Sequence, residues 1–250
     1  MKITRLSWAG LWIQSGNTNI LIDPLQNITE RMIAFLGKPK EPIIEIPGNI
    51  GNPHVFVTHI HPDHFDMELI EYLINDSTTF YAPASAVEKA KSEGLVGIVP
   101  NLYEPILAGD LTVTAVPAVD WVGDEQVSWV IRDGDKQIFH GGDTSWHGYW
   151  WKFAKRFGAF DAVFLPVNGV TGIPPGIEPV SDIAGTLTPK QAVTAARILS
   201  AKQMIPIHYN LFNNPPLYNE FPNVEGELEM EAGKQRVTLN CLASGSCIEI

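Results

Sequence analysis

The stretch Thr58-His59-Ile60-His61-Pro62-Asp63-His64 places three imidazoles and one carboxylate within six consecutive residues. It follows the β-branched run His54–Thr58, which predicts a short buried strand, so these side chains are expected in the loop at the end of that strand. Histidine and aspartate are favoured ligands of Zn²⁺ and similar divalent cations. Because the chain holds only seven histidines, their crowding here predicts a metal site.

Short strands and capped helices are predicted on both sides of this loop. On the N-terminal side we expect a hairpin of Ile3–Ile13 and Thr18–Ile22, followed by a long loop over residues 25–52 with room for one helical turn. After the loop we expect a helix over residues 66–74 capped by Asp66, a strand over residues 80–82 and a helix over Ala84–Glu93.

Short strands and capped helices are also predicted in the second half of the chain. Residues Leu107–His140 are expected to be all β, with a tight turn at Asp133-Gly134. The later elements expected are a helix ending at Phe157, strands Ala162–Val167 and Gln203–Ile207, a helix opened by the capping box Thr188–Gln191 and ending near Ser200, and strands Val237–Leu242 and Cys247–Ile250. This order favours one domain over residues 1–250, with two packed sheets and helices outside them.

Composition narrows the class of partner. The net charge is −11 and no run of Lys or Arg occurs, which disfavours a nucleic-acid partner and leaves a small-molecule substrate. Cys241 and Cys247 lie outside any C-x-x-C motif, so reduced structural thiols are expected. The sequence contains neither a signal-peptide pattern nor an apolar run long enough for a bilayer. We therefore expect a cytoplasmic protein with no membrane partner.

Further motifs occur in an order that resembles the metallo-β-lactamase superfamily. Besides the His59–His64 run, the matching segments are Asp23-Pro24 after an apolar strand, Gly142-Asp143-Thr144, and Ile205–Tyr209 with His208 at the end of a strand. The Thr188–Ala192 helix start is typical of one branch, which includes ascorbate-6-phosphate lactonase. The resemblance spans nearly the whole chain and implies an α+β fold, the αββα four-layer sandwich.

The resemblance also implies a site for two divalent metal ions, most commonly zinc, with manganese or iron as alternatives. It assigns His59 and His61, with Asp120 as a candidate, to the first ion. It assigns Asp63, His64 and His208 to the second ion and lets Asp143 bridge the two. Asp63 would also orient the attacking water, and Asp23 would buttress the metal loop.

Two departures from the family pattern bear on this assignment. The family usually has a histidine where this chain has Val119-Asp120-Trp121. The third ligand of the first ion is then Asp120 or is absent, and the alternative interpretation makes Asp120 a turn residue. Many relatives of the branch carry a histidine where this chain has Trp8, which predicts an altered pocket wall.

The function implied is hydrolysis of a small ester, lactone, amide or phosphoester by metal-activated hydroxide. The alternatives are a phosphodiesterase or nuclease of the same fold, and a degenerate module that binds metal without catalysis. The superfamily's di-iron members that reduce oxygen or nitric oxide place glutamate where this chain has His61, which favours hydrolysis over redox chemistry.

Several residues near these motifs are weaker candidates. His147 follows Asp143 by four residues and is a candidate general acid. His140 is a candidate to donate a hydrogen bond to a metal ligand, with strand-end packing as the alternative, and His54 is interpreted as structural. Candidates for the substrate pocket are Tyr209, Asn210 and at least one of Trp146, Trp150 and Trp151. The loop Gly172–Gly185 is interpreted either as a mobile flap or as an ordered loop over the site.

Overall fold

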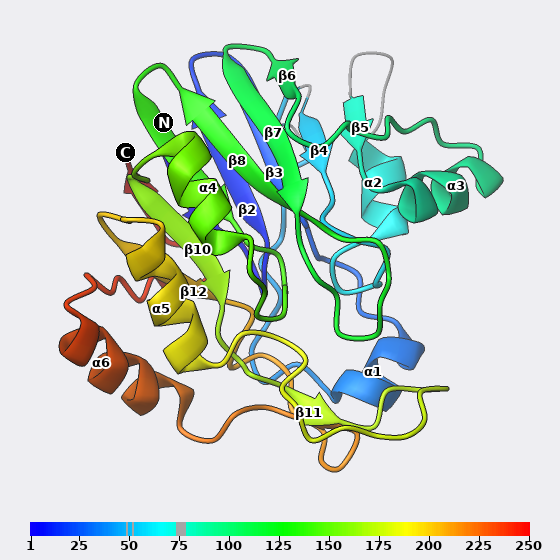
Figure 1. Cartoon of the computed structure of the whole chain (residues 1–250). Coiled ribbons are helices and arrows are strands. Elements are labelled where there is room, and N and C mark those ends of the chain that lie inside the picture. The colour runs from blue at the N-terminus through cyan, green and yellow to red at the C-terminus, as the bar shows by residue number, and fades with distance from the viewer. Residues whose placement is uncertain (49, 52, 74–78) are drawn as a thin grey trace.

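The computed structural model describes residues 1–48, 50–51, 53–73 and 79–250. It contains two six-stranded sheets that pack face to face (Figure 1). The first has the order β14-β1-β2-β3-β4-β5, with strands Cys247–Glu249, Lys2–Arg5, Leu11–Ser15, Thr18–Ile22, His54–Phe56 and Thr79–Tyr81. The second has the order β12-β10-β9-β8-β7-β6, with strands Met204–Ile207, Ala162–Pro166, Lys136–His140, Val127–Asp133, Leu111–Pro117 and Pro105–Ala108.

Alternation along the strands decides which side chains fill the space between the sheets. In β8, Trp129 and Ile131 belong to the central cluster, whereas Val130 belongs to the cluster on the outer face. In the first sheet, Phe56 of β4 points inward and Val55 points outward. Successive residues of a strand point to opposite faces, so each sheet buries apolar side chains on both sides and must be covered by helices.

Those helices form the two outer layers. Helices α4 (Trp150–Phe157), α5 (Pro189–Ile198) and α6 (Val224–Gln235) cover the second sheet (Figure 1). Helices α2 (Met67–Leu73) and α3 (Ala84–Ser92) lie beside β4 and β5 of the first. Smaller elements are α1 (Glu30–Leu36) and the short pair β11 (Thr171–Gly172) and β13 (Tyr218–Asn219). The predicted αββα sandwich is therefore confirmed.

Local signals at the helix starts and turns behave as predicted. Thr188 and Gln191 form a reciprocal capping box at α5, and the Leu69 N–H donates to Asp66 Oδ1 at 3.0 Å. The β8–β9 hairpin turns at Gly134, whose φ of 58° suits glycine. No helix of the described residues is long and apolar enough to cross a membrane.

Other predictions need correction. Residues Ile3–Ile13 are two antiparallel strands, β1 and β2, because the chain reverses between Leu6 and Gly10. Residues Val237–Leu242 form only an isolated bridge, Leu239 to Met204, instead of a strand. Helix α6 was not predicted, because its buried positions include only three apolar residues and a glutamate. Residue 74 of the predicted helix over 66–74 lies outside the described residues.

The parallel strands explain where polar side chains gather. In the first sheet β3 and β4 run parallel, with Ile22 paired to Phe56. In the second sheet β9, β10 and β12 run parallel, with Phe164 paired to His140 and Pro166 to Ile207. Carboxyl ends of parallel strands lie at the same edge of a sheet, where α/β proteins commonly bind ligands.

Candidate metal centre

The predicted ligands emerge from the strand ends of both sheets. Asp23 follows β3, and the His59–His64 loop follows β4. Asp120 follows β7, Asp143 follows β9 and His208 follows β12. The Val127 N–H donates to the Thr58 carbonyl at 3.0 Å and ties the two sheets together beside this edge.

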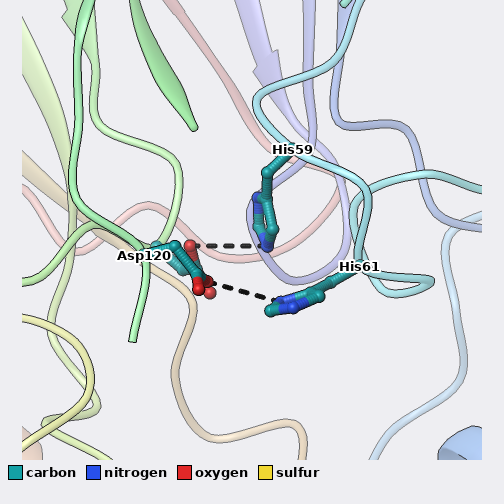
Figure 2. Close-up of side chains that lie close together, drawn as sticks. His59, His61 and Asp120 are labelled. Atoms are coloured by element: carbon teal, nitrogen blue, oxygen red, sulfur yellow. Dashed lines mark ion pairs between the residues drawn. The ribbon is translucent and has the colours of Figure 1, made fainter. Parts of the chain in front are cut away.

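A first cluster is formed by His59, His61, Asp120 and Asp143, with one possible ligand atom from each within 4.8 Å of the others. His61 Nδ1 lies 3.7 Å from Asp120 Oδ2, and the three side chains of His59, His61 and Asp120 converge in Figure 2. The other nitrogen of His61, Nε2, is hydrogen-bonded to Asp124 at 3.0 Å. That contact leaves Nδ1 facing the cluster.

Asp120 combines the two roles that the sequence left open. Its Oδ1 accepts the backbone N–H groups of Val122 and Asp124 at 2.8 and 2.9 Å, which is the role of a turn residue. Its Oδ2 is buried, has no hydrogen-bond partner among the described residues and faces His61. One oxygen therefore holds the turn and the other is available to a cation.

A second cluster is formed by Asp63, His64 and His208, whose possible ligand atoms also lie within 4.8 Å of one another. Asp63 Oδ2 is 3.6 Å from His64 Nε2 and 3.7 Å from His208 Nε2. All three residues are buried. This cluster is more enclosed than the first, in which the side chain of His61 is 30% exposed.

Asp143 lies between the two clusters. Its Oδ1 is 3.7 Å from His59 Nε2 in the first cluster. Its Oδ2 is 3.8 Å from His64 Nε2 and 3.9 Å from His208 Nε2 in the second. Because each oxygen faces a different cluster, the carboxylate is placed to contact a cation in both.

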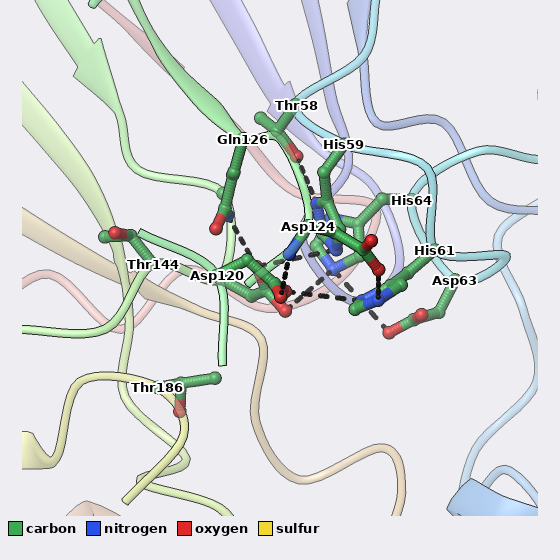
Figure 3. A network of polar contacts seen from close by, with 12 residues as sticks. Thr58, His59, His61, Asp63, His64, Asp120, Asp124, Gln126, Thr144 and Thr186 are labelled. Atoms are coloured by element: carbon green, nitrogen blue, oxygen red, sulfur yellow. Dashed lines mark hydrogen bonds and ion pairs between the residues drawn. The ribbon is translucent and has the colours of Figure 1, made fainter. Parts of the chain in front are cut away.

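Behind the ligands, Asp23 fixes their orientation from inside the core. Its Oδ2 accepts from Thr58 Oγ1 at 2.7 Å and is paired with His64 Nδ1 at 2.8 Å. Thr58 Oγ1 in turn lies 3.0 Å from His59 Nδ1, as Figure 3 shows for the labelled pair. Hydrogen bonding to one ring nitrogen orients an imidazole and leaves the other nitrogen to the metal. The predicted role of Asp23 as a buttress agrees with these contacts.

The unpaired atoms test whether this arrangement fits metal ions. The Nε2 atoms of His59, His64 and His208 are buried and have no hydrogen-bond partner among the described residues. Such atoms are costly unless something binds them. Two ligand atoms about 2.1 Å from a tetrahedral cation lie about 3.4 Å apart. The separations of 3.6 to 3.9 Å found here are too long for hydrogen bonds and close to that spacing.

Protonation follows from the same crowding. Burial, only partly opposed by Asp143, lowers the pKa of His59 to about 3, so its imidazole is neutral. Burial disfavours charge on His64 as well, but the carboxylates of Asp63, Asp143 and Asp23 outweigh it and raise the pKa of His64 to about 10. A cation that enters the second cluster must therefore displace a proton from His64.

Comparison with known proteins agrees with the fold and with a metal-dependent hydrolase. A family model described as the beta-lactamase superfamily domain matches residues 18–209. The chain belongs to the metallo-β-lactamase superfamily. A UPF0173 metal-dependent hydrolase from Thermococcus kodakarensis is 24% identical over 91% of this chain and 93% of its own length. The predicted superfamily is thereby confirmed, and the likeness to ascorbate-6-phosphate lactonase stays a prediction.

Solved structures show that the superfamily fold carries different chemistries. The isothiocyanate hydrolase from Delia radicum gut bacteria has a TM-score of 0.75 at 17% identity, over 100% of this chain and 99% of its own. CmlA, a diiron β-hydroxylase from Streptomyces venezuelae, has a TM-score of 0.74 at 15% identity, over 100% of this chain and 54% of its own. At these identities the likeness concerns the fold, so the chemistry must be argued from the site.

The other two candidate histidines, His140 and His147, are placed differently from the predicted metal ligands. The His147 ring stacks on Trp150 with centroids 4.2 Å apart, and its other ring contacts are Tyr149 and Phe153. The structure does not bring His147 into either described cluster. His140 Nε2 bonds to the Ala9 carbonyl at 2.7 Å rather than to a metal ligand, and its Nδ1 accepts the Gly142 N–H.

The residues predicted to contact substrate differ in how deeply they are buried. Trp150 is fully buried in the core, whereas Trp146 and Trp151 are 36% and 58% exposed. Tyr209 is buried beneath the Arg5 guanidinium, and the Asn210 side chain is hydrogen-bonded to Glu225. Their contact with substrate stays a prediction.

The two ends of the Gly172–Gly185 loop are held by hydrogen bonds. Gly172 belongs to β11, and the Gly185 N–H donates to the Val170 carbonyl at 2.7 Å. The Ser145 hydroxyl donates to the Gly185 carbonyl. These contacts match the ordered-loop interpretation at both ends.

Sequence reasoning missed three groups of residues at the site. The Gln126 amide donates to Asp143 Oδ1 at 2.6 Å, Asp124 holds His61, and the Asn168 amide donates to the Tyr218 hydroxyl at 2.8 Å. Burial and the charges of Asp63 and Asp143 raise the pKa of Tyr218 well above its usual value. Their sequence surroundings lack a motif, although Asn168 follows β10 at the same sheet edge.

The cysteine prediction is confirmed in one respect. Cys241 and Cys247 are both free, but both are exposed and so contribute little to the core.

Proposed function

We propose that this metallo-β-lactamase superfamily enzyme is a metal-dependent hydrolase of a small ester, lactone, amide or phosphoester. The proposed ligands are His59, His61 and Asp120 for one cation, Asp63, His64 and His208 for the other, and Asp143 for both. The observation that carries the proposal is the position of Asp143, whose two oxygens face two separate groups of unpaired imidazole nitrogens. Two divalent cations there would polarise a substrate oxygen and lower the pKa of a water toward 7.

The residues of the chain supply orientation and proton transfer. Asp63 carries its charge at neutral pH because, although burial opposes ionisation, the imidazoles of His64 and His208 hold its pKa below the usual range. It can therefore accept a hydrogen bond from the attacking water. Tyr218 stays protonated, and because its oxygen already accepts from Asn168, its own proton is available to an oxygen of the substrate.

The donor set supports zinc as the first choice, with manganese and iron as alternatives. Four of the seven proposed ligands are imidazoles, which suit zinc. Asp120 adds a carboxylate to the first site where the family usually has an imidazole, and oxygen ligands shift the preference toward manganese or iron. Metal analysis of protein purified without added metal tests this choice.

The observations also weigh against the two alternatives. A phosphodiesterase or nuclease acting on long polyanions would need a basic groove, and the chain carries a net charge of −11. A degenerate binding module would be favoured if Asp120, which stands where the family usually has a histidine, could not bind a cation. Asp120 Oδ2, however, faces His61 as a ligand would. Two cations bound per chain would support the enzyme, and one or none would support the degenerate module.

The test is turnover of chromogenic esters, lactones, amides and phosphodiesters by protein loaded with Zn²⁺ or Mn²⁺. We expect His61→Ala to abolish the activity and to release the cation of the first site. The matched control is His54→Ala, at the start of β4, the strand that precedes the His61 loop, and outside both clusters. Full activity of His61→Ala, or no turnover by the loaded wild-type protein on the whole panel, would contradict the proposal.

A further inference from the structure

Trp8 occupies an unusual place beside the second cluster. It lies in the turn between β1 and β2 with a φ of 60° and is 1% exposed. A bulky residue such as tryptophan rarely adopts this left-handed backbone conformation. It does so only where contacts with the surrounding structure hold it there. Trp8 contacts two of the proposed ligands of the second cation, His208 and Asp63.

Trp8 contacts His208 in two ways. The backbone N–H of His208 donates to the backbone carbonyl of Trp8 at 3.0 Å. The indole and imidazole rings lie with centroids 3.9 Å apart at an angle of 38°. His208 itself has a φ of 58°, and neither of its ring nitrogens has a hydrogen-bond partner among the described residues. The orientation of this ligand therefore depends on Trp8 more than on any hydrogen bond to its ring.

Trp8 also contacts Asp63. The indole N–H donates to Asp63 Oδ2 at 2.9 Å in a buried position. This is the same oxygen that faces the Nε2 atoms of His64 and His208. A carboxylate oxygen has two lone pairs, so the indole uses one and leaves the other directed at the imidazoles. Trp8 thus fixes which atom of Asp63 a cation would meet.

The turn that carries Trp8 is anchored to the loop of Asp143. The Gly142 N–H donates to His140 Nδ1 at 3.3 Å, so the proton of this ring is on Nε2, which donates to the Ala9 carbonyl at 2.7 Å. Gly142 precedes Asp143, and Ala9 follows Trp8. These bonds hold the main chain next to Trp8 in place and do not involve its indole, so the indole N–H acts on Asp63 and not on Asp143.

We propose that Trp8 is a positioning residue that organises Asp63 and His208 for the second cation and leaves the first site unaffected. The proposal rests on the proposed function, because it assumes that this pair binds a metal ion. From the sequence, Trp8 was expected only to alter the wall of the pocket. The proposal gives it a more specific role, the orientation of two metal ligands. Residues that orient ligands commonly change metal affinity about 10- to 100-fold when they are mutated.

The variant Trp8→Phe removes the indole N–H and keeps an aromatic ring next to His208. We expect the affinity of the second site for Zn²⁺ to fall about 10- to 100-fold, with the first site unchanged. The control is Trp12→Phe, because the Trp12 indole also donates to a side-chain oxygen, Asn19 Oδ1 at 3.0 Å, away from the clusters. Metal-free protein would be titrated with Zn²⁺ against a chromophoric chelator, which reads binding without any substrate.

A second measurement uses the wild-type protein and does not depend on how the variant folds. With ¹⁵N-labelled tryptophan there are seven indole N–H signals, and several belong to buried rings. One of the buried signals should shift with the second equivalent of Zn²⁺ rather than with the first.

The outcomes separate the two proposals. Wild type with two sites, and Trp8→Phe weakened at one of them, supports both. Three outcomes would overturn the role of Trp8 alone. They are equal zinc affinities in Trp8→Phe and wild type, equal losses of affinity at both sites, and indole signals that do not shift with the second equivalent of Zn²⁺. A wild-type protein that binds fewer than two cations would overturn the proposed function, and the role of Trp8 with it.

Discussion

Replacing His147 with phenylalanine should make the stability of the protein less dependent on pH between 6.5 and about 4. The His147 ring is buried against Trp150, its Nδ1 accepts the Tyr149 N–H at 3.2 Å, and its Nε2 has no partner among the described residues. This burial lowers its pKa from 6.5 to about 4. Phenylalanine can keep the stacking on Trp150 and cannot take up a proton.

The sign and the magnitude follow from linkage between protonation and folding. Because the folded pKa lies below the unfolded one, neutral His147 contributes stability that is fully present above pH 6.5. That contribution is lost as the pH falls through 6.5 toward 4, where the unfolded chain binds a proton and the folded chain resists it. A drop from 6.5 to about 4 corresponds to about 3 kcal/mol.

The assay is urea unfolding of the metal-free wild type and His147→Phe at pH 7, 6, 5 and 4. Other titrating groups act in both proteins, so the difference between their free energies of unfolding isolates His147. We expect that difference to change by up to about 3 kcal/mol in favour of the variant at the lowest pH. Parallel loss of stability in the two proteins would refute the reasoning.

The same variant tests the role predicted for His147 from the sequence. A general acid commonly contributes about 10²- to 10⁴-fold to the rate, and a pKa near 4 leaves the imidazole neutral at pH 7. We expect His147→Phe to keep most of the hydrolytic activity. A loss of a hundredfold or more with both cations bound would restore the general-acid assignment.

Three further substitutions probe the proposed site. Asp120→Asn keeps an oxygen for the turn and loses the charge that faces His61. The first site should lose about tenfold or more in affinity for Zn²⁺, measured by chelator competition, and unchanged affinity would leave Asp120 a turn residue only. Asp23→Asn breaks the buried pair with His64 and should destabilise the metal-free protein by about 3 kcal/mol in urea unfolding; an unchanged midpoint would contradict the buttress role. Tyr218→Phe should lower kcat about 100-fold with both cations retained, whereas a change in KM alone would place Tyr218 in substrate binding.

Much of the fold and of the candidate site could be predicted because the signals were local. His59–His64, Asp143 and His208 each come soon after a short apolar strand, and parallel strands bring such ends to one sheet edge. The residue types therefore indicated the chemistry, and the strand ends indicated the place. The capping box of α5 is read directly from four consecutive residues.

What could not be predicted depended on the direction of side chains in three dimensions. His147 is four residues from Asp143, yet its ring turns to the aromatic core around Trp150. The spacing of Leu6 and Trp8 suits a continuous strand, and only the fold shows the chain reversing there to bring the indole to Asp63. Asp120 could be interpreted as a ligand or a turn residue from sequence, because the choice depends on which oxygen faces which neighbour.

The two clusters differ in the protonation and exposure of their histidines, and this difference determines which cluster binds a cation first. In the first, His59 is neutral and the side chain of His61 is partly exposed, so a cation can bind without displacing a proton from His59. In the second, every ligand is buried and His64 holds a proton among three carboxylates. A cation there must displace that proton, whereas Asp63 and His208 are already held by Trp8. We therefore expect the first site to fill before the second at neutral pH, and this order makes the roles of Asp120 and Trp8 separable in a single titration.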